Sequence, residues 1–284
     1  MIVKVRKIKV IKQIKYLIRN IVSILMSLIV LTPFFMIILN SMKTHREANK
    51  LQLNFIGISF KQILENYYRV FALTNLSKGF FNSFVVTSIS ALAVIITASM
   101  AGFVISRRKT KALKILNMII ISGLTLPLAT VPIFFILNKI GLINTYIGAI
   151  LVYTAGNFAF AYFLFVGYYK TLSAEIDEAA IIDGANPIVL FFKIIFPLLK
   201  PATVTVLITQ IMSIWNDFNI SIYLLNSPAK RTAVLSTYSF IGQKASEWNL
   251  LFADVVVVSL PIVIIYLCLQ KHIVSGLTAG ALKG

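Results

Sequence analysis

The sequence predicts an all-α polytopic membrane protein with six transmembrane helices. Of its 284 residues, 58% are hydrophobic and only 13% are charged, whereas charged residues make up about 25% of a typical soluble domain. Six stretches are free of charge, or nearly so, over the roughly 20 residues that a helix needs to cross a bilayer. The strands of an outer-membrane barrel would instead alternate over about 10 residues, which excludes that class.

The six predicted spans share a predominantly apolar character. They comprise residues 20–42, 79–106, 115–138, 140–169, 201–225 and 250–270. Prolines stand inside several spans, among them Pro127 and Pro132. Neighbouring helices in a membrane can satisfy the backbone groups that a proline leaves unpaired. We therefore expect helices with some kinks.

Basic residues predict the orientation of the chain. Residues 1–19 contain seven Lys or Arg and precede 23 uncharged residues, a run longer than the apolar region of about 7 to 15 residues in a cleavable signal. Basic segments beside a span stay in the cytoplasm. We predict a cytoplasmic segment over 1–19, a six-span domain over 20–270 and a cytoplasmic tail over 271–284.

The formal net charge of +18 is compatible with nucleic-acid binding or with basic loops that set topology and meet anionic lipid. The sequence contains no aromatic and basic nucleic-acid module, so we expect membrane lipid and no nucleic acid as a partner. Two scattered histidines, His45 and His272, and the single Cys268 predict neither a metal site nor an intramolecular disulfide.

An acidic patch interrupts this basic chain between the fourth and fifth spans. Four of the nine acidic residues fall within nine consecutive positions, namely Glu175, Asp177, Glu178 and Asp183. Helices that lie on a lipid surface are rich in Lys and Arg, because anionic headgroups repel carboxylates. We therefore expect this segment to dock to a protein partner rather than to lie on lipid.

Start and stop signals divide the acidic loop into two helices. Ser173 can cap a first helix that runs through Asp183, and Gly184 suits the left-handed position at its end. Asn186 followed by Pro187 is a second start signal, because proline is favoured at the first helical position. The loop is predicted to be a helix, a sharp turn and a second helix.

Residues 178–197 read EAAIIDGANPIVLFFKIIFP and resemble the EAA loop of ABC importer permeases. The spacing of EAA, Gly184 and Pro197 matches that family throughout, with Phe196 in place of its leucine. The proline that commonly precedes the loop helix is missing. Further stretches, including the tail SGLTAGALKG, are similar to the six-span, maltose-type carbohydrate-uptake branch.

The resemblance implies that the loop over about 171–200 is a coupling helix that docks in a cleft of a separate ATPase. The residues implied in that contact are Glu178, Ala179, Ala180, Asp183, Gly184 and Ala185. In this subunit type the tail also reaches the ATPases, which implicates Gly276, Gly280 and Lys283. A frayed terminus is the alternative for the tail.

The resemblance also implies the function: a permease subunit of a binding-protein-dependent importer for a sugar or oligosaccharide, and not an enzyme. Its implied partners are a related permease in a heterodimer, two cytoplasmic ATPase subunits and an extracytoplasmic solute-binding protein, in a bacterial cell membrane with both termini inside. The chain lacks a G-x-x-x-x-G-K-[ST] phosphate loop. ATP and Mg are therefore expected on the partner ATPase, with no cofactor on this chain.

Polar and aromatic side chains in the fourth and fifth spans are candidates for a gate or cavity. They are Asn157, Gln210, Trp215, Asn216 and Asp217. Asp217 lies about 24 Å beyond the start of its span at 1.5 Å per residue, near the outer end. We favour a structural or gating role for it over direct contact with substrate.

Three alternatives remain open from the sequence. An ABC permease for a non-sugar solute differs from the main interpretation only in its cargo. A secondary carrier or channel would usually need a chain of acid, His or Arg residues in its spans, which this sequence lacks. A membrane scaffold that only docks partners is the third alternative.

Overall fold

The computed structural model describes residues 2–241 and 247–281, and every named element in them is a helix. The all-α prediction is confirmed. Four helices are long and apolar enough to cross a membrane, and they correspond to the first, second, fourth and sixth predicted spans: Lys15–Ser41, Leu76–Arg107, Tyr146–Tyr169 and Trp248–Gln270. The chain forms two compact units, Met1–Thr74 with Thr237–Val257 and Asn75–Ser236 with Val258–Gly284.

The first unit contains one whole membrane helix, the start of a second one and several short helices. Its elements are α1 (Ile2–Ser41), α2 (His45–Ala48), α3 (Phe60–Thr74), the 3-10 helix η2 (Thr237–Phe240) and the start of α14 (Trp248–Ala281). α1 continues through Pro33, as a membrane helix can. α3 is a short helix in the first long loop.

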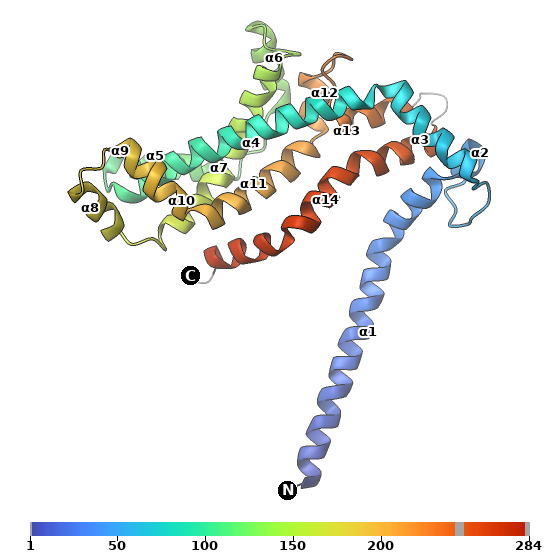
Figure 1. Ribbon diagram of the computed structural model, residues 1–284, viewed down its shortest axis with the longest axis horizontal. Coiled ribbons are helices and arrows are strands. Elements are labelled where there is room, and N and C mark those ends of the chain that lie inside the picture. Colours follow the sequence, from blue (N-terminus) through green and yellow to red (C-terminus); the bar gives the residue numbers. More distant parts are fainter. Residues whose placement is uncertain (1, 242–246, 282–284) are drawn as a thin grey trace. The chain divides into compact units, whose positions relative to one another are not determined.

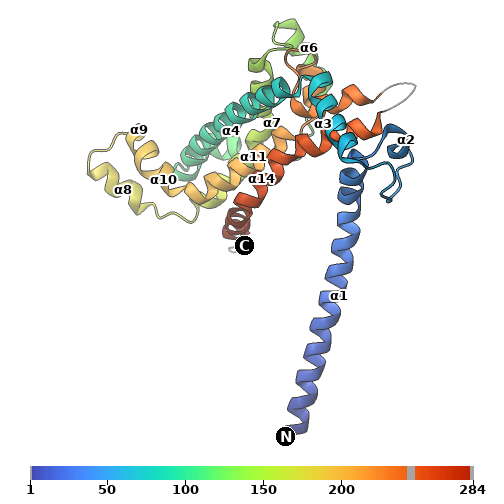
Figure 2. The ribbon, with the colours of Figure 1, turned by 45° about the vertical axis from the view of Figure 1, so that its right-hand side comes forward.

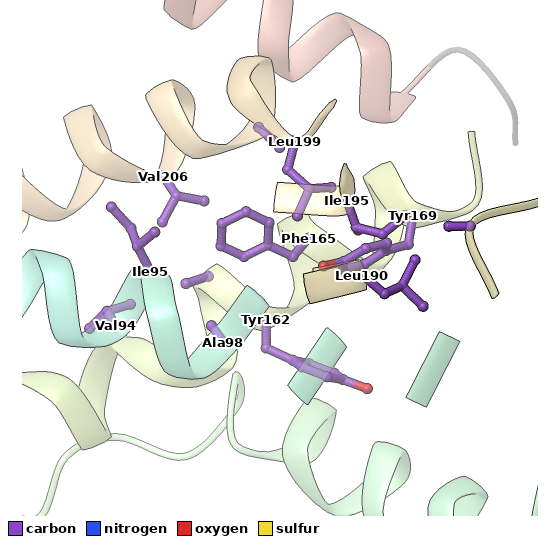
Figure 3. Packing of buried hydrophobic residues seen from close by; sticks show 13 residues of the cluster. Val94, Ile95, Ala98, Tyr162, Phe165, Tyr169, Leu190, Ile195, Leu199 and Val206 are labelled. Atoms are coloured by element: carbon purple, nitrogen blue, oxygen red, sulfur yellow. The ribbon is translucent and has the colours of Figure 1, made fainter. Parts of the chain in front are cut away.

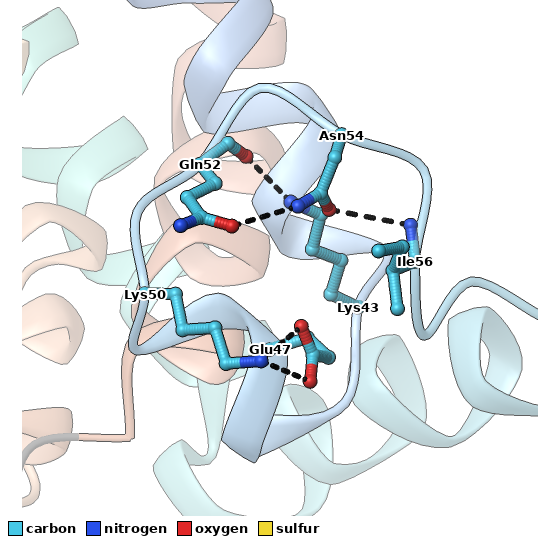
Figure 4. A network of polar contacts seen from close by, with 6 residues as sticks. All are labelled: Lys43, Glu47, Lys50, Gln52, Asn54 and Ile56. Atoms are coloured by element: carbon cyan, nitrogen blue, oxygen red, sulfur yellow. Dashed lines mark hydrogen bonds and ion pairs between the residues drawn. The ribbon is translucent and has the colours of Figure 1, made fainter.

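The segment between α1 and α3 is a folded polar cap rather than a solvated loop. Lys43 is fully buried, and its Nζ donates a hydrogen bond to the carbonyl oxygen of Gln52 at 2.6 Å. Burial lowers the pKa of Lys43, against the opposing effect of the nearby Glu47 carboxylate. Figure 4 shows this contact together with the Glu47–Lys50 ion pair at 2.7 Å and the bond from Asn54 to Gln52.

Asn66 of α3 ties this cap to both membrane helices of the unit. Its fully buried amide donates to the carbonyl oxygens of Ser41 and Lys43, each at 2.9 Å. Its Oδ1 accepts from Asn249 Nδ2 at 2.8 Å and from Gln62 Nε2 at 2.9 Å. One side chain therefore satisfies polar groups of α1, α3 and α14.

We expect Asn66→Ala to lower the free energy of unfolding by about 2–3 kcal/mol, because each buried group left unpaired costs about 1–3 kcal/mol. The measurement is the thermal unfolding midpoint of the purified complex. The control is Asn20→Ala, which truncates an exposed asparagine of α1. Equal midpoints for the two variants would contradict the proposed role of Asn66.

The second unit is a bundle built on three helices that contact one another. These are α4 (Leu76–Arg107), α7 (Tyr146–Tyr169) and α11 (Lys200–Trp215). Its shorter helices are α5 (Lys111–Ser122), α6 (Thr130–Lys139), α8 (Glu175–Ile182), α9 (Pro187–Val189), the π-helix η1 (Leu190–Ile195), α10 (Phe196–Leu198), α12 (Asn219–Leu224) and α13 (Ala233–Ser236). Both ribbon views show α8, α9 and α10 at one end of α4 (Figures 1 and 2).

Small residues allow α4 and α7 to approach closely, as is typical of membrane helix pairs. A Cβ at Gly102 would lie 3.1 Å from the ring of Tyr169 and 3.4 Å from Phe165 Cβ. Ala98 is fully buried one turn earlier, and Tyr169 Oη donates to the carbonyl oxygen of Ser99 at 3.0 Å. Figure 3 shows Ala98, Phe165 and Tyr169 in the buried cluster that joins the helices.

The third predicted span, 115–138, is not one helix. The chain forms α5 and α6, with a non-helical segment between them that contains Pro127. Proline lacks the amide hydrogen of the helical ladder and disfavours helical backbone at the residue before it. Pro132 falls in the first turn of α6, where that hydrogen is not needed. Neither helix alone is long enough to cross a membrane, so the count of six spans stays a prediction.

The fourth span begins later than the sequence predicts. The prediction is a helix from residue 140, whereas α7 begins at Tyr146. Thr145 caps it, because its Oγ1 accepts a hydrogen bond from the backbone N–H of Gly148 at 3.0 Å. Before this cap the chain turns at Asn144, which has a φ of 56°. Local turn chemistry thus outweighs the apolar pattern of residues 140–145.

The fifth span ends earlier than predicted. The prediction extends to residue 225, whereas α11 ends at Trp215 and α12 begins at Asn219. The carboxylate of Asp217 in the intervening turn accepts hydrogen bonds from the first turn of α12. A capping side chain of this kind favours a new helix start over a continuous helix.

Candidate functional site

The acidic loop folds into the predicted helix, turn and second helix. α8 covers Glu175–Ile182, and its N-cap residue is Ala174 rather than the predicted Ser173, although Ser173 Oγ accepts from the Glu175 N–H at 3.2 Å. Gly184 has a φ of +83°, which confirms the predicted left-handed end of the first helix. Asn186 Oδ1 accepts from the Val189 N–H at 2.9 Å, so the second start signal is also confirmed.

An ion pair anchors α8 to the end of α4. Arg107 Nε lies 2.6 Å from Asp177 Oδ2, and these side chains are 18% and 11% exposed. The same guanidinium donates to the carbonyl oxygens of Leu172 and Ser173, both at 3.3 Å. Charge-assisted hydrogen bonds of a planar guanidinium fix geometry as well as adding energy. Arg107 therefore sets where α8 begins relative to α4.

Sequence reasoning missed this pair. The available signal was the helical position of Asp177. Asp177 and Ala180 are three residues apart and share a face of α8, and both are buried. An acid on the same face as a small residue indicates an inward-facing carboxylate with a basic partner.

The six residues predicted to contact an ATPase divide into two groups. Glu178, Ala179, Asp183 and Gly184 are exposed. Ala180 is 6% exposed within the buried cluster of the bundle, and Ala185 packs against the same cluster. The exposed group is available to a partner, whereas the other two residues hold the loop on its own bundle.

Isoleucines add an apolar element to the exposed face. Ile182 is 85% exposed, Ile188 is 71% exposed and Ile181 is 60% exposed, all within a few residues of the exposed carboxylates. Single exposed apolar side chains are ordinary, but a contiguous group of them indicates an interaction surface. Sequence reasoning stressed the acids and missed this apolar component.

The inner side of the loop is packed into the bundle. Ala180 of α8 shares a buried cluster with Leu190 and Ile195 of η1 and with residues of α4, α7 and α11. The helical segment Pro187–Leu198 meets α11 at an angle of 78°. A close-packed interior transmits strain. This cluster therefore connects α8 mechanically to the membrane helices.

Two of the predicted cavity residues, Asn157 and Gln210, lie on α7 and α11. Asn157 donates to the carbonyl oxygen of Tyr153 at 2.9 Å, and its Oδ1 accepts from Ser213 Oγ at 3.2 Å. Gln210 is 1% exposed, and its Oε1 has no hydrogen-bond partner among the described residues. Asn157 thus links the two helices, whereas Gln210 has a buried acceptor oxygen that no described residue pairs.

Two more predicted cavity residues lie at the end of α11. Trp215 is 7% exposed, and its indole N–H donates to the carbonyl oxygen of Val258 at 3.3 Å. Asn216 is exposed and donates to the carbonyl oxygen of Met212 at 2.9 Å. Trp215 therefore packs within the unit, and of these two only Asn216 presents its side chain to the surroundings.

Asp217 makes hydrogen bonds of the kind expected for the structural role favoured from the sequence. Its Oδ1 accepts from Tyr153 Oη at 2.9 Å and from the backbone N–H groups of Ile220 at 2.8 Å and Ser221 at 3.2 Å. The carboxylate therefore caps α12 and joins it to α7.

We expect Asp217→Ala to lower the free energy of unfolding by about 1–2 kcal/mol, because losing a helix cap costs about that much. Asp217→Asn keeps an oxygen acceptor and should retain most of the stability and transport. Thermal unfolding and uptake into proteoliposomes measure the two effects. Loss of uptake in Asp217→Asn at unchanged stability would contradict a capping role and favour a role for the charge itself.

Two of the predicted tail residues, Gly276 and Gly280, lie within α14, whereas Lys283 lies outside the described residues. The tail contact with an ATPase stays a prediction. Among the described residues there is no group of three or more His, Cys, Asp or Glu side chains that could hold a metal ion.

Comparisons with known proteins agree on one family. Residues 93–279 match the family described as "Binding-protein-dependent transport system inner membrane component". The chain is 34% identical over 255 residues to the melibiose/raffinose/stachyose import permease protein MelC of Bacillus subtilis (strain 168), covering 89% of this chain and 91% of that protein. It is 33% identical over 277 residues to a probable starch degradation products transport system permease protein, AmyC, of Thermoanaerobacterium thermosulfurigenes, covering 95% and 97%.

A solved structure supports the fold. A chain of a bacterial ABC transporter involved in the import of the acidic polysaccharide alginate superposes with a TM-score of 0.78 at 21% identity, covering 91% of this chain and 96% of that one. The helical bundle, the loop that carries α8 and the match over 187 residues therefore point the same way. This chain belongs to the family of inner-membrane permease components of binding-protein-dependent ABC transporters.

Proposed function

We propose that this chain is the permease subunit of an ABC importer for a sugar or oligosaccharide and forms half of an alternating-access pathway. The relatives that are at least 30% identical over most of the chain include permeases named for melibiose, raffinose and stachyose and for starch degradation products. The observation that carries the coupling part of the proposal is α8. It is held by the Arg107–Asp177 pair and presents exposed acids and isoleucines.

The proposed assembly has three kinds of protein partner. A related permease forms the second half of the pathway, two ATPase subunits bind ATP and Mg on the cytoplasmic side, and a solute-binding protein delivers the sugar from outside. The basic segment 1–19 supports cytoplasmic termini, because positive segments beside a span stay inside. With that orientation α8 faces the ATPases.

The proposed mechanism is a rigid-body transfer of movement. Closure of the ATPase dimer displaces the exposed face of α8, namely Glu178, Ala179 and Asp183. The displacement passes through Ala180 and the packed segment η1 to α4, α7 and α11. Interfaces of this kind switch between discrete arrangements rather than deform continuously. The transport pathway then opens outward as the binding protein releases its sugar.

The decisive experiment uses the purified complex in proteoliposomes. ATP hydrolysis and uptake are measured with and without the binding protein, with melibiose-type oligosaccharides, malto-oligosaccharides, and amino acids as the non-sugar arm. We expect hydrolysis to rise only when binding protein and an oligosaccharide are both present. Stimulation by amino acids alone would overturn the sugar assignment, and uptake without any ATPase would overturn the importer assignment itself.

A further inference from the structure

A cavity of about 840 Å³ lies in the second unit, between the end of α4, the start of α5 and the last turns of α7. Its lining combines two kinds of side chain. It includes the exposed Lys and Arg side chains of the 108–114 segment and Lys170, together with Leu113, Ile121, Val166 and the half-exposed Phe163. The lining contains no acidic residue.

Most basic residues of the lining are not neutralised by the parts of the chain that the structure describes. Arg107 also lines the cavity and pairs with Asp177. The other five bases make no ion pair with any described residue: Arg108, Lys109, Lys111, Lys114 and Lys170. Like charges in one confined site repel one another, and an anion in the cavity would offset that repulsion.

The length of the cavity indicates a ligand with one charged and one apolar end. Lys170, directly after α7, is seven residues from Phe163, which is about 10 Å along the helix, and Lys111 and Ile121 are ten residues apart on α5, which is about 15 Å. The lining thus extends from the basic helix ends to apolar residues of α5 and α7. Its volume far exceeds that of a water, about 30 Å³, so inorganic phosphate would fill only a small part of it.

Neutral donors complete the polar part of the lining. Asn117 accepts a hydrogen bond from Tyr162 Oη through its Oδ1 at 2.6 Å, which fixes the amide and leaves its N–H groups able to donate to a ligand. Ser106 lines the same cavity, and its buried hydroxyl has no partner among the described residues. Phosphodiester oxygens accept hydrogen bonds of both kinds.

We propose that this cavity binds an anionic phospholipid, with its phosphodiester among the lysines at the start of α5 and the first part of an acyl chain along Ile121 and Phe163. Basic pockets between membrane helices recognise such headgroups. Arg107 belongs both to the cavity lining and to the anchor of α8. The bound lipid therefore lies against the ion pair that positions the coupling loop. The proposal does not depend on which solute is transported.

The test measures lipid association at the cavity in the assembled importer. Phe163→Trp introduces a fluorescent reporter into the lining, and the complex is placed in phosphatidylcholine nanodiscs with a minor share of brominated phosphatidylglycerol or brominated phosphatidylcholine. We expect stronger quenching by the brominated phosphatidylglycerol. In Lys111→Gln/Lys114→Gln we expect this preference to fall about tenfold, which is about 0.7 kcal/mol for each lysine at tenfold per 1.4 kcal/mol.

The matched control is Lys61→Gln/Lys139→Gln, which removes the same charge from exposed lysines outside the cavity and should keep the preference. Each other outcome is decisive. Displacement of the lipid by added inorganic phosphate would overturn the lipid assignment in favour of a free phosphate. Equal quenching by both brominated lipids would mean that the cavity has no anionic lipid site, or that a partner protein covers it, and would equally overturn the proposal. An equal loss of the preference for the anionic lipid in both double variants would show that net charge causes the preference and would overturn the proposal of a site in this cavity.

Discussion

Replacing Gly184 by valine is expected to lower binding-protein-stimulated transport by at least about tenfold while leaving membrane insertion intact. Gly184 has a φ of +83°, and a Cβ there would meet no atom of the described residues within 4 Å. The effect is therefore one of backbone conformation and not of steric clash. A β-branched residue in the left-handed region costs about 1–3 kcal/mol.

That strain is relieved most easily by rearranging the turn. The N–H of Gly184 donates to the carbonyl oxygen of Ile181, and the N–H of Ala185 donates to that of Ala180, both at 3.0 Å. These two bonds close the end of α8 and fix its direction. A valine that moves the backbone out of the left-handed region breaks this closure, so α8 no longer meets the ATPase in the same orientation.

Gly141 supplies the matched control for this prediction. It has a φ of +73° in the turn after α6, and a Cβ there also meets no described atom within 4 Å. Gly141→Val therefore introduces the same backbone strain away from α8, and it should retain coupled transport. Uptake and ATP hydrolysis are measured for both variants with and without binding protein. Normal coupling in Gly184→Val would remove the coupling role of the turn.

Breaking the Arg107–Asp177 pair is expected to have the second large effect. Removing one partner of a fully buried pair costs about 3–5 kcal/mol. Because these side chains are 18% and 11% exposed, we expect about 2–3 kcal/mol for Arg107→Gln or Asp177→Asn. Arg107→Gln should be the more harmful, since it also removes the donors to the carbonyl oxygens of Leu172 and Ser173.

The double variant Arg107→Gln/Asp177→Asn separates the charge interaction from packing. It leaves no unpaired charge, so its loss of stability should be smaller than the sum of the two single losses. Thermal unfolding of the complex gives the stabilities, and limited proteolysis of the α7–α8 connection reports whether the loop is released. Strictly additive losses would show that the pair does not act as a unit.

Arg69→Gln/Glu247→Gln is the control for a surface pair. Both side chains are 41% exposed, and exposed pairs contribute about 0–1 kcal/mol. We expect little change in stability and none in coupling. A loss as large as that of Arg107→Gln would mean that the assay does not resolve buried from exposed charge.

The features that the sequence predicted correctly are those that depend on a few neighbouring residues. Glycine adopts a positive φ without steric cost, which is the conformation of Gly184. Asn186 before Pro187 satisfies the first amides of a helix within one turn. The segments that form α1, α4, α7 and α14 are long and apolar, and these two properties are enough to predict membrane helices. The sequence was less reliable where two local signals competed. Pro127 inside an apolar run predicts a kink or a break, and packing decides between them.

Contacts between distant segments could be decided only by the tertiary structure. The four carboxylates of the loop are alike in the sequence, yet Asp177 is buried against Arg107, 70 residues away, whereas Glu178 and Asp183 are exposed. The buried amide of Asn66 and the basic cavity beside α5 likewise join residues that no local pattern connects. The sequence by itself determined that an acidic helix, a left-handed glycine and a second helix follow the fourth span, because these are local backbone preferences. The tertiary structure decided which acid anchors that helix and which acids face a partner, because an ion pair needs two side chains that only folding brings together.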